Sequence, residues 1–241
     1  TWARSVARWM PAVQSGRSRD DIGVLLDRLR TEPIEVRFQR LAEQARALAR
    51  RLGRTEPAVI MEPNGVRLPR EGYGALFGSF IHLIRNAVDH GLEAGEERLA
   101  AKKSDRGHLY FRAQVEGGFC VIEIQDDGRG IDWEQVKHKA GRFGLPHSNR
   151  AELTEALFTD GLSTRDEASA TSGRGAGMGA VREACHAMGG KIELSSEHGH
   201  GTTVRVRVPL RALPPSQGTL RAAVRATINP QPGEVRASLP A

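Results

Sequence analysis

Two pairs of β-rich segments constrain the fold of this chain most strongly. Residues 108–126, HLYFRAQVEGGFCVIEIQD, form two runs of apolar and β-branched residues around a Gly-Gly pair, which is typical of a β-hairpin. Residues 191–197 and 202–210 give a second hairpin, because valines alternate with arginines along its second half and so face one way. A chain with two such hairpins is expected to build a sheet with antiparallel pairs.

Segments with helical spacing of apolar residues lie before and between these hairpins. Residues 35–52 repeat apolar positions every three or four residues and are followed by Gly53, a residue type that commonly follows a helix C-terminus. A strand is expected at 58–62, and helices are expected at 73–92, 150–158 and 176–188. Hairpins combined with helices place the chain in the α/β class, as a two-layer α/β sandwich.

Composition narrows the range of functions. The 241 residues are 39% hydrophobic and 27% charged, as in soluble globular proteins, and no apolar run is long enough to insert into a membrane. The net charge is +6, but the arginines are scattered and no nucleic-acid motif accompanies them, so we expect no nucleic-acid partner. Cys120 and Cys185 lie in apolar periodic segments, which favours buried free thiols and a cytoplasmic location.

An unusual polar stripe follows the expected helix within residues 79–95, SFIHLIRNAVDHGLEAG. At about 100° per residue, with His82 at zero, Asn86 lies near +40°, Asp89 near −20° and His90 near +80°. The opposite half of the helix is apolar. A solvated polar face is one reading of this stripe. Because Asn, Asp and His are mediocre helix formers, their grouping favours a bound ligand instead.

Two glycine clusters follow the polar helix. DDGRGID, residues 126–132, leaves the end of a strand, and SGRGAGMGAV, residues 172–181, opens a helix. Glycines let the backbone approach a ligand, and free N–H groups at a helix start favour an anion such as phosphate. Plain turns are the alternative for either cluster alone, and neither matches a P-loop. The polar segment between them, 132–172, is expected to be largely irregular and to form a lid.

The order of these motifs resembles the GHKL ATP-binding fold shared by histidine kinases, gyrase-type ATPases and Hsp90. HLIRNAVDHGLE at 82–93 is similar to the N box of the chemotaxis histidine kinase CheA, and DDGRGID is similar to its G1 box. LFTDGLST at 157–164, followed by SGRGAGM, resembles the F and G2 boxes, and GHGTTVRVRVPL at 199–210 resembles the closing hairpin. The resemblance covers residues 33–211 and implies a mixed sheet packed on helices, with a long ATP lid.

The resemblance implies a role for each matching residue. Asn86 would ligate Mg²⁺ through its amide oxygen, a hard ligand suited to that ion, and His82 would take the general-base position. Asp89 and His90 would lie beside the metal and phosphates. Asp126 would accept a hydrogen bond from the adenine amino group, with support from Thr203. The glycine-rich turns would make room for the base and present backbone N–H groups to phosphate, through Gly128, Gly130, Gly173, Arg174, Gly175, Gly177 and Met178.

We therefore expect the catalytic core of an ATP- and Mg²⁺-dependent histidine kinase. The N-terminal 1–55 is expected to be a helical segment, 56–211 the GHKL core and 212–241 a Pro-rich tail. The implied partners are a histidine phosphotransfer domain in trans and a response regulator downstream, with a chemoreceptor or coupling protein as a further candidate. The resemblance leaves open whether the chain forms a homodimer.

The chain departs from the family pattern in three respects that leave alternatives open. Gly179 stands where the family usually has Asp, no segment resembles the helical bundle that carries the phospho-accepting histidine, and nothing after Leu210 resembles the receptor-coupling domain. A GHKL ATPase that hydrolyses ATP for a conformational clamp is one alternative, although such enzymes place Glu where His82 stands. A scaffold that senses ATP without catalysis is the other alternative.

Overall fold

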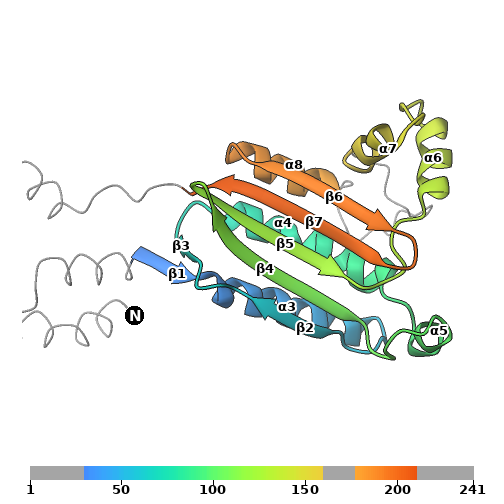
Figure 1. The fold of residues 1–241 in the computed structure, drawn as a ribbon, viewed down its shortest axis with the longest axis horizontal. Coiled ribbons are helices and arrows are strands. Elements are labelled where there is room, and N and C mark those ends of the chain that lie inside the picture. The colour runs from blue at the N-terminus through green and yellow to red at the C-terminus, as the bar shows by residue number, and fades with distance from the viewer. Residues whose placement is uncertain (1–29, 160–176, 211–241) are drawn as a thin grey trace, which may run out of the picture. The chain divides into compact units, whose positions relative to one another are not determined.

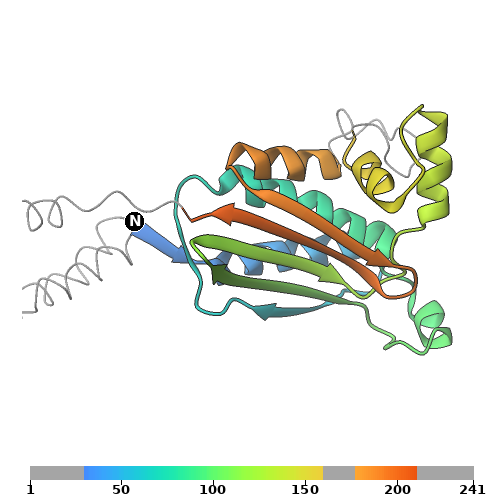
Figure 2. The ribbon, with the colours of Figure 1, turned by 45° about the horizontal axis from the view of Figure 1, so that its top comes forward.

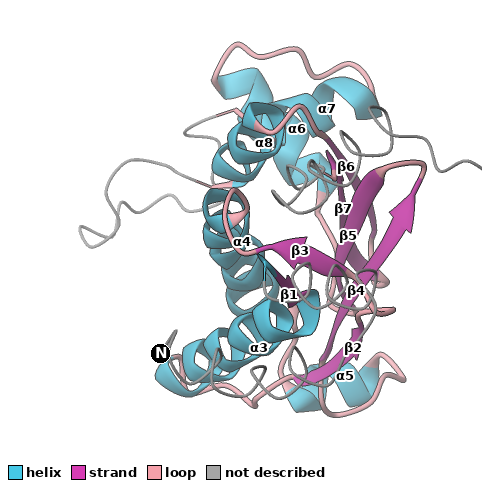
Figure 3. Cartoon of the chain, turned by 90° about the vertical axis from the view of Figure 1, so that its left-hand side faces the viewer, coloured by secondary structure: helices cyan, strands magenta, loops and turns pink. Residues whose placement is uncertain are grey.

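The structure is a computed structural model that describes residues 30–159 and 177–210. Residues 33–210 form one compact unit built on a five-stranded sheet in the order β2-β4-β5-β7-β6. The strand bounds are β2 Ala58–Glu62, β4 His108–Glu116, β5 Phe119–Asp126, β6 Lys191–Glu197 and β7 Gly201–Pro209. Helices cover one face of this sheet, as Figure 3 shows, and the predicted two-layer α/β sandwich is confirmed.

The sheet is mixed. β2 runs parallel to β4, with Ala58 opposite His108, and the other three neighbouring pairs are antiparallel. Gly117 and Gly118 join β4 to β5 with φ values of +53° and +81°. Two consecutive positive φ angles are typical of the tight turn that favours glycine, and they confirm the predicted hairpin. The second predicted hairpin, β6–β7, is also present (Figure 1).

The described helices are α3 Ile34–Arg51, α4 Gly74–Arg85, α5 Gly95–Ala100, α6 Trp133–Arg142, α7 Arg150–Leu157 and α8 Met178–Ala187. A π-helix, Asn86–Gly91, follows α4, and the short strands β1 Thr31–Pro33 and β3 Arg67–Pro69 complete the described elements. The expected helix over 35–52 is confirmed as α3, and Gly53 follows it with a φ of +65°. The expected elements at 58–62, 150–158 and 176–188 correspond to β2, α7 and α8.

The expectation of a largely irregular segment after residue 132 is wrong for its first part, which contains α6. The Asp132 side chain accepts a hydrogen bond from the backbone N–H of Gln135 and caps this helix. Only Val136 and Ala140 of α6 are buried, so its apolar pattern is too sparse to indicate a helix. α6 and α7 lie beyond the end of the sheet where β5 ends (Figures 1 and 2), and they share a small apolar cluster of their own.

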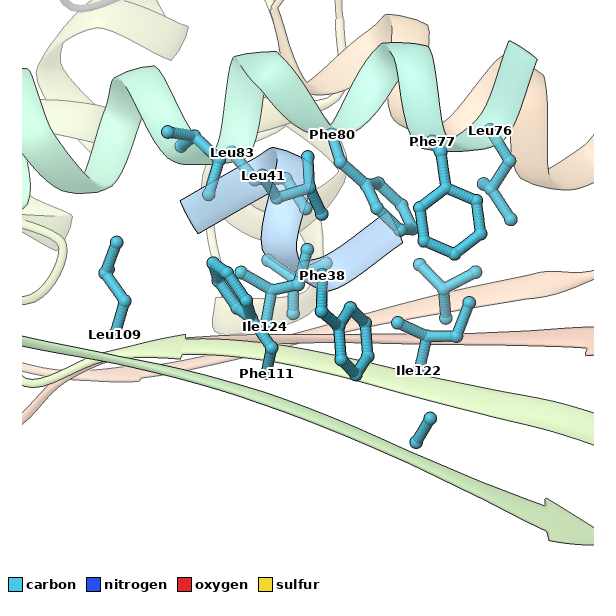
Figure 4. Close-up of a cluster of buried hydrophobic side chains, with 14 of the residues drawn as sticks. Phe38, Leu41, Leu76, Phe77, Phe80, Leu83, Leu109, Phe111, Ile122 and Ile124 are labelled. Atoms are coloured by element: carbon cyan, nitrogen blue, oxygen red, sulfur yellow. The ribbon is translucent and has the colours of Figure 1, made fainter. Parts of the chain in front are cut away.

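The main core lies between the sheet and helices α3, α4 and α8. Phe38 of α3, Phe80 of α4 and Phe111 of β4 are fully buried in it (Figure 4), and the Phe38 and Phe111 ring centroids are 5.7 Å apart. Because α3 contributes to this core, we place it with the compact unit of residues 33–210 and not with the separate segment expected over 1–55.

The two cysteines are free and buried, as the sequence predicts. Burial raises the pKa of the Cys120 thiol to about 12 and that of Cys185 to about 11. In the two described ranges, no helix has the length and apolar character needed to cross a bilayer.

Candidate functional site

A cavity of about 420 Å³ opens at the end of the sheet where β5 stops. Its walls come from the helix after α4, the loop after β5, the first turn of α8 and the inner sides of α6 and α7. The apolar part of the lining includes Leu83, Ile124, Met178 and Val204, whereas Asn86, His90 and Asp126 supply polar groups. A flat apolar ligand with one polar edge and an attached polar chain fits such a lining.

The polar helix does not stay α-helical. α4 ends at Arg85, and Asn86–Gly91 forms a π-helix, in which the Leu92 N–H donates to the Ala87 carbonyl at 2.7 Å. Single π-turns of this kind are frequent at functional sites because they turn side chains away from the α-helical stripe. Here Asn86 and His90 both line the cavity. Asp89 does not line it, and its carboxylate lies 3.7 Å from the His90 imidazole.

Asp126, the last residue of β5, is the most deeply placed polar group of the cavity. It is only 7% exposed, and its carboxylate accepts hydrogen bonds from the backbone N–H groups of Gly128, at 2.9 Å, and of Thr202. Burial, aided by the charge of Asp127, raises the pKa of Asp126 to about 6. A buried carboxylate with free acceptor capacity facing a cavity is suited to a hydrogen-bond donor on a ligand.

The glycines of DDGRGID allow three backbone segments to meet beside Asp126. A Cβ on Gly128 would overlap the Gly91 carbonyl, and a Cβ on Gly130 would overlap the Glu197 carbonyl. The segments are joined by hydrogen bonds from the Arg129 N–H to the Gly91 carbonyl and from the Gly199 N–H to the Arg129 carbonyl, each 2.8 Å. The glycines that were expected to make room for a ligand therefore make room for protein backbone, and only Gly130 also lines the cavity.

The first turn of α8 forms the opposite wall. Gly177, Met178 and Gly179 line the cavity, and within the described part of the chain no side chain caps this helix start. Uncapped N–H groups at a helix N-terminus favour an anionic ligand. Three other predicted residues of this motif, Gly173, Arg174 and Gly175, lie outside the described residues.

The cavity brings together six of the thirteen site residues that the sequence indicates. It collects Asn86, His90, Asp126, Gly130, Gly177 and Met178. Four described candidates do not line it, namely His82, Asp89, Gly128 and Thr203. His82 is half-buried one turn before Asn86, and burial together with the neighbouring Arg85 charge lowers its pKa. A histidine with a lowered pKa is neutral at pH 7 and can accept a proton.

Thr202, and not Thr203, belongs to the cavity. Thr202 shares the inner face of β7 with Val204, and its hydroxyl lies 3.1 Å from that of Ser196. Thr203 is one residue along the strand, so its side chain points to the other face of the sheet. Of the two threonines, Thr202 is therefore the one whose position lets it contact a ligand in the cavity. The sequence also missed the lining residues Gln135, Leu157 and Thr159, which carry no motif.

Comparison with known proteins identifies the family of this chain. Residues 77–212 match the family described as "Histidine kinase-, DNA gyrase B-, and HSP90-like ATPase", and the chain belongs to this family. Membership of this ATPase family implies that the domain binds ATP.

The chain is 34% identical over 200 residues to the chemotaxis protein CheA of Klebsiella aerogenes. The matched segment is 82% of this chain and 30% of that protein. The chain is also 34% identical over 186 residues to a gliding motility regulatory protein of Myxococcus xanthus, covering 75% of the chain and 24% of the relative. The chain thus spans under a third of the length of these relatives. Among solved structures, the chain is 20% identical to a blue-light activated histidine kinase of Erythrobacter litoralis, with a TM-score of 0.46. The match covers 74% of this chain and 42% of the kinase chain.

Arg182 of α8 binds the C-terminal end of α7 and the residue after it, next to the cavity-lining residues Leu157 and Thr159. Its guanidinium donates to the Glu155 carboxylate at 2.8 Å and to the Phe158 carbonyl at 3.0 Å, and it lies over the Phe158 ring. Phe158 sits between Leu157 and Thr159, so we expect Arg182→Met to loosen this wall and weaken ATP binding about three- to tenfold by calorimetry. Glu155→Gln, which removes only the exposed ion pair, should have a smaller effect. Unchanged ATP affinity in Arg182→Met would contradict this role.

Proposed function

We propose that this chain is the catalytic core of a chemotaxis-type histidine kinase, which transfers the γ-phosphoryl group of ATP to a histidine on a separate domain. The observation that carries the proposal is a buried acceptor, Asp126, in the same cavity as an amide and an imidazole, Asn86 and His90. The 34% identity to a chemotaxis protein CheA over 82% of the chain supports the choice of reaction.

The adenine end of the nucleotide would lie against Asp126. The carboxylate can accept a hydrogen bond from the exocyclic amino group, while the apolar side chains of Ile124, Met178 and Val204 can contact the base. The Gly128 and Thr202 N–H groups hold the carboxylate in place, so it needs little reorganisation to accept the ligand. Guanine presents a carbonyl where adenine presents this donor, so the site should favour adenine.

The phosphates would lie between the π-helix and the start of α8. The uncapped first turn of α8 offers N–H groups to the phosphate oxygens, and His90 offers a ring nitrogen. In the described ranges, no group of three or more His, Cys, Asp or Glu side chains could hold a metal ion. Magnesium often relies on one or two protein oxygens together with waters and phosphates, and the Asn86 amide oxygen suits that pattern. When bound, Mg²⁺ would neutralise the charge that develops on the phosphates.

His82 is proposed to act as the general base toward the incoming nucleophile. It lies one helical turn before Asn86 without lining the cavity, and its lowered pKa keeps the imidazole able to accept a proton. Phosphoryl transfer depends mainly on positioning and charge neutralisation, so the chain needs a nucleophile placed in line with the γ-phosphate. A histidine on a separate helical domain would supply it, and a response regulator would then take the phosphoryl group.

A labelled-phosphate experiment tests the proposal. The protein is mixed with Mg²⁺, γ-labelled ATP and a histidine phosphotransfer domain encoded in the same or a neighbouring gene. We expect acid-labile, base-stable label on that domain, and we expect His82→Ala to reduce the label strongly while ATP still binds. Release of the label only as free phosphate would replace the kinase with a hydrolytic ATPase. ATP binding with neither transfer nor hydrolysis would indicate a nucleotide-sensing scaffold.

A further inference from the structure

We propose that Lys103 is a positioning residue for nucleotide recognition, which fixes the loop that follows Asp126 at the adenine end of the cavity. Lys103 lies just after α5, outside every motif that the sequence indicates, and it does not line the cavity. The inference rests on the proposed function, because it concerns the same adenine site.

All three N–H donors of the Lys103 ammonium are used. The Nζ atom donates to the Glu93 carboxylate at 2.8 Å, to the Asp127 carbonyl at 2.9 Å and to the Gly128 carbonyl at 2.8 Å. An ammonium has three donors and no acceptor, so this group is fully satisfied, and its side chain is only 17% exposed. Two of its three partners are main-chain oxygens of the residues that directly follow the adenine-recognition carboxylate.

These two carbonyls need such a partner because the sheet has ended. β5 stops at Asp126, which pairs with Leu109 on one side and Thr202 on the other. Beyond it, the Gly128 N–H turns back to the Asp126 carboxylate, and the Asp127 and Gly128 carbonyls face Lys103, which does not line the cavity. Buried carbonyls that lose their strand partners must be satisfied in another way, and a cation gives the strongest hydrogen bonds for that purpose.

A second cation, Arg98, binds the Asp127 side chain and shares the Glu93 carboxylate with Lys103. Arg98 is 1% exposed, and its guanidinium donates to the Asp127 carboxylate at 2.8 Å and to the Glu93 carboxylate at 3.0 Å. The His108 N–H donates to the other Asp127 oxygen at 2.8 Å. Arg98 also donates to the Asp127 carbonyl, at 3.3 Å, so Lys103 and Arg98 share that oxygen. The side chain of Asp127 is therefore fixed by Arg98 and His108, and Lys103 adds the shorter hydrogen bond to the Asp127 carbonyl and the hydrogen bond to the Gly128 carbonyl.

The backbone before Lys103 adopts a conformation that is unusual for its residue type. α5 ends with hydrogen bonds from the Lys103 N–H to the Arg98 carbonyl and from the Lys102 N–H to the Leu99 carbonyl, the pattern of a Schellman motif. Lys102 occupies the left-handed position of this motif with a φ of +58°, where glycine is usual. This end of α5 aims Lys103 at the loop, and the strain at Lys102 indicates that the surrounding contacts hold the segment there.

The test compares Lys103→Met with Lys102→Met, which removes the same charge from the exposed neighbour. Affinities for ATP, adenosine and inorganic triphosphate are measured by competition against a fluorescent nucleotide. For Lys103→Met we expect ATP and adenosine to bind about tenfold more weakly, by the same factor, with triphosphate unchanged. Lys102→Met should bind all three ligands like the wild type. A role limited to overall stability would weaken all three ligands together.

Each other outcome has a defined meaning. If Lys103→Met folds and binds adenosine like the wild type, or loses triphosphate and adenosine equally, the positioning role is overturned. If Lys103→Met does not fold, the same binding measurements are made on Lys103→Gln. Weaker adenosine binding with unchanged triphosphate binding in Lys103→Gln supports the positioning role, and unchanged adenosine binding overturns it. Failure of the wild type to bind ATP would refute the proposed function itself, which is a separate result.

Discussion

Replacing Asn86 by alanine is expected to abolish phosphoryl transfer, by at least about a thousandfold, while adenosine binding stays within about threefold of the wild type. Asn86 lines the cavity at the start of the π-helix and offers the amide oxygen proposed to hold Mg²⁺. A metal ion contributes several kcal/mol of charge stabilisation in such reactions, so its loss affects the rate most. Adenosine lacks phosphates and contacts the other end of the cavity, near Asp126. The measurements are transfer of labelled phosphate and calorimetric binding of adenosine.

Two controls make this result specific. Gln44→Ala removes an exposed amide from α3 and should change neither quantity. The Mg²⁺ dependence of ATP binding should also disappear in Asn86→Ala, whereas metal-free ATP binding should persist. An equal loss of metal-free and metal-dependent binding would instead assign Asn86 a role in folding or in direct nucleotide contact.

The sheet could be predicted from the sequence because local rules and tertiary packing agree there. Gly117-Gly118 permits the positive φ angles of a tight turn. Buried and more exposed residues alternate along most of β4, and they alternate in β5 from Ile122 onwards. α3 was predictable for the same reason, since its apolar stripe faces the sheet and Gly53 ends it. In these elements a single periodic pattern determines both the local structure and the buried face.

The polar helix was harder to predict because its hydrogen-bond pattern changes within one turn. A wheel of 100° per residue puts Asp89 on the same stripe as His82 and Asn86, but the π-helix from Asn86 alters the direction of every later side chain. As a result, His90 faces the cavity with Asn86 and Asp89 does not. Sequence periodicity contains no signal for this change, because the change lies in the backbone hydrogen-bond pattern and not in the spacing of apolar residues.

The assignment of Thr203 shows a different kind of error. The alternation of Val204, Val206 and Val208 on the inner face of β7 already implied that position 202 shares that face. The resemblance to the family motif pointed to Thr203. The alternation of side chains between the two faces of a strand would have selected Thr202 instead. Lys103 and Arg182 could not have been found from sequence, since each acts on a segment more than 20 residues away.

Replacing Asp126 by asparagine is expected to weaken ATP binding about ten- to a hundredfold. The substitution places an amide, with a donor face, where the site offers only an acceptor, and an unsatisfied pair of this kind costs on the order of 1–3 kcal/mol. In the wild type, ATP affinity should fall as the pH drops through about 6, because the carboxylate that accepts the hydrogen bond becomes protonated there. Calorimetry at pH 5 to 8 checks both effects, and asparagine should remove this pH dependence. ATP affinity equal to that of the wild type would place the adenine elsewhere.

The same substitution should stabilise the protein without nucleotide. The pKa of Asp126 is raised from 3.8 in a solvated carboxyl to about 6 in the folded state, so the folded state binds the proton more tightly than the unfolded state. Unfolding free energy must then decrease as the pH rises from about 4 to about 6, by on the order of 2–3 kcal/mol for a shift of this size. Asparagine carries no charge to bury, so Asp126→Asn should equal the wild type near pH 4 and exceed its unfolding free energy by about that amount at pH 8. Denaturant unfolding at the two pH values measures this difference. A variant that binds ATP poorly because it is misfolded would be less stable at both pH values, whereas one that has lost only the adenine acceptor would be more stable at pH 8.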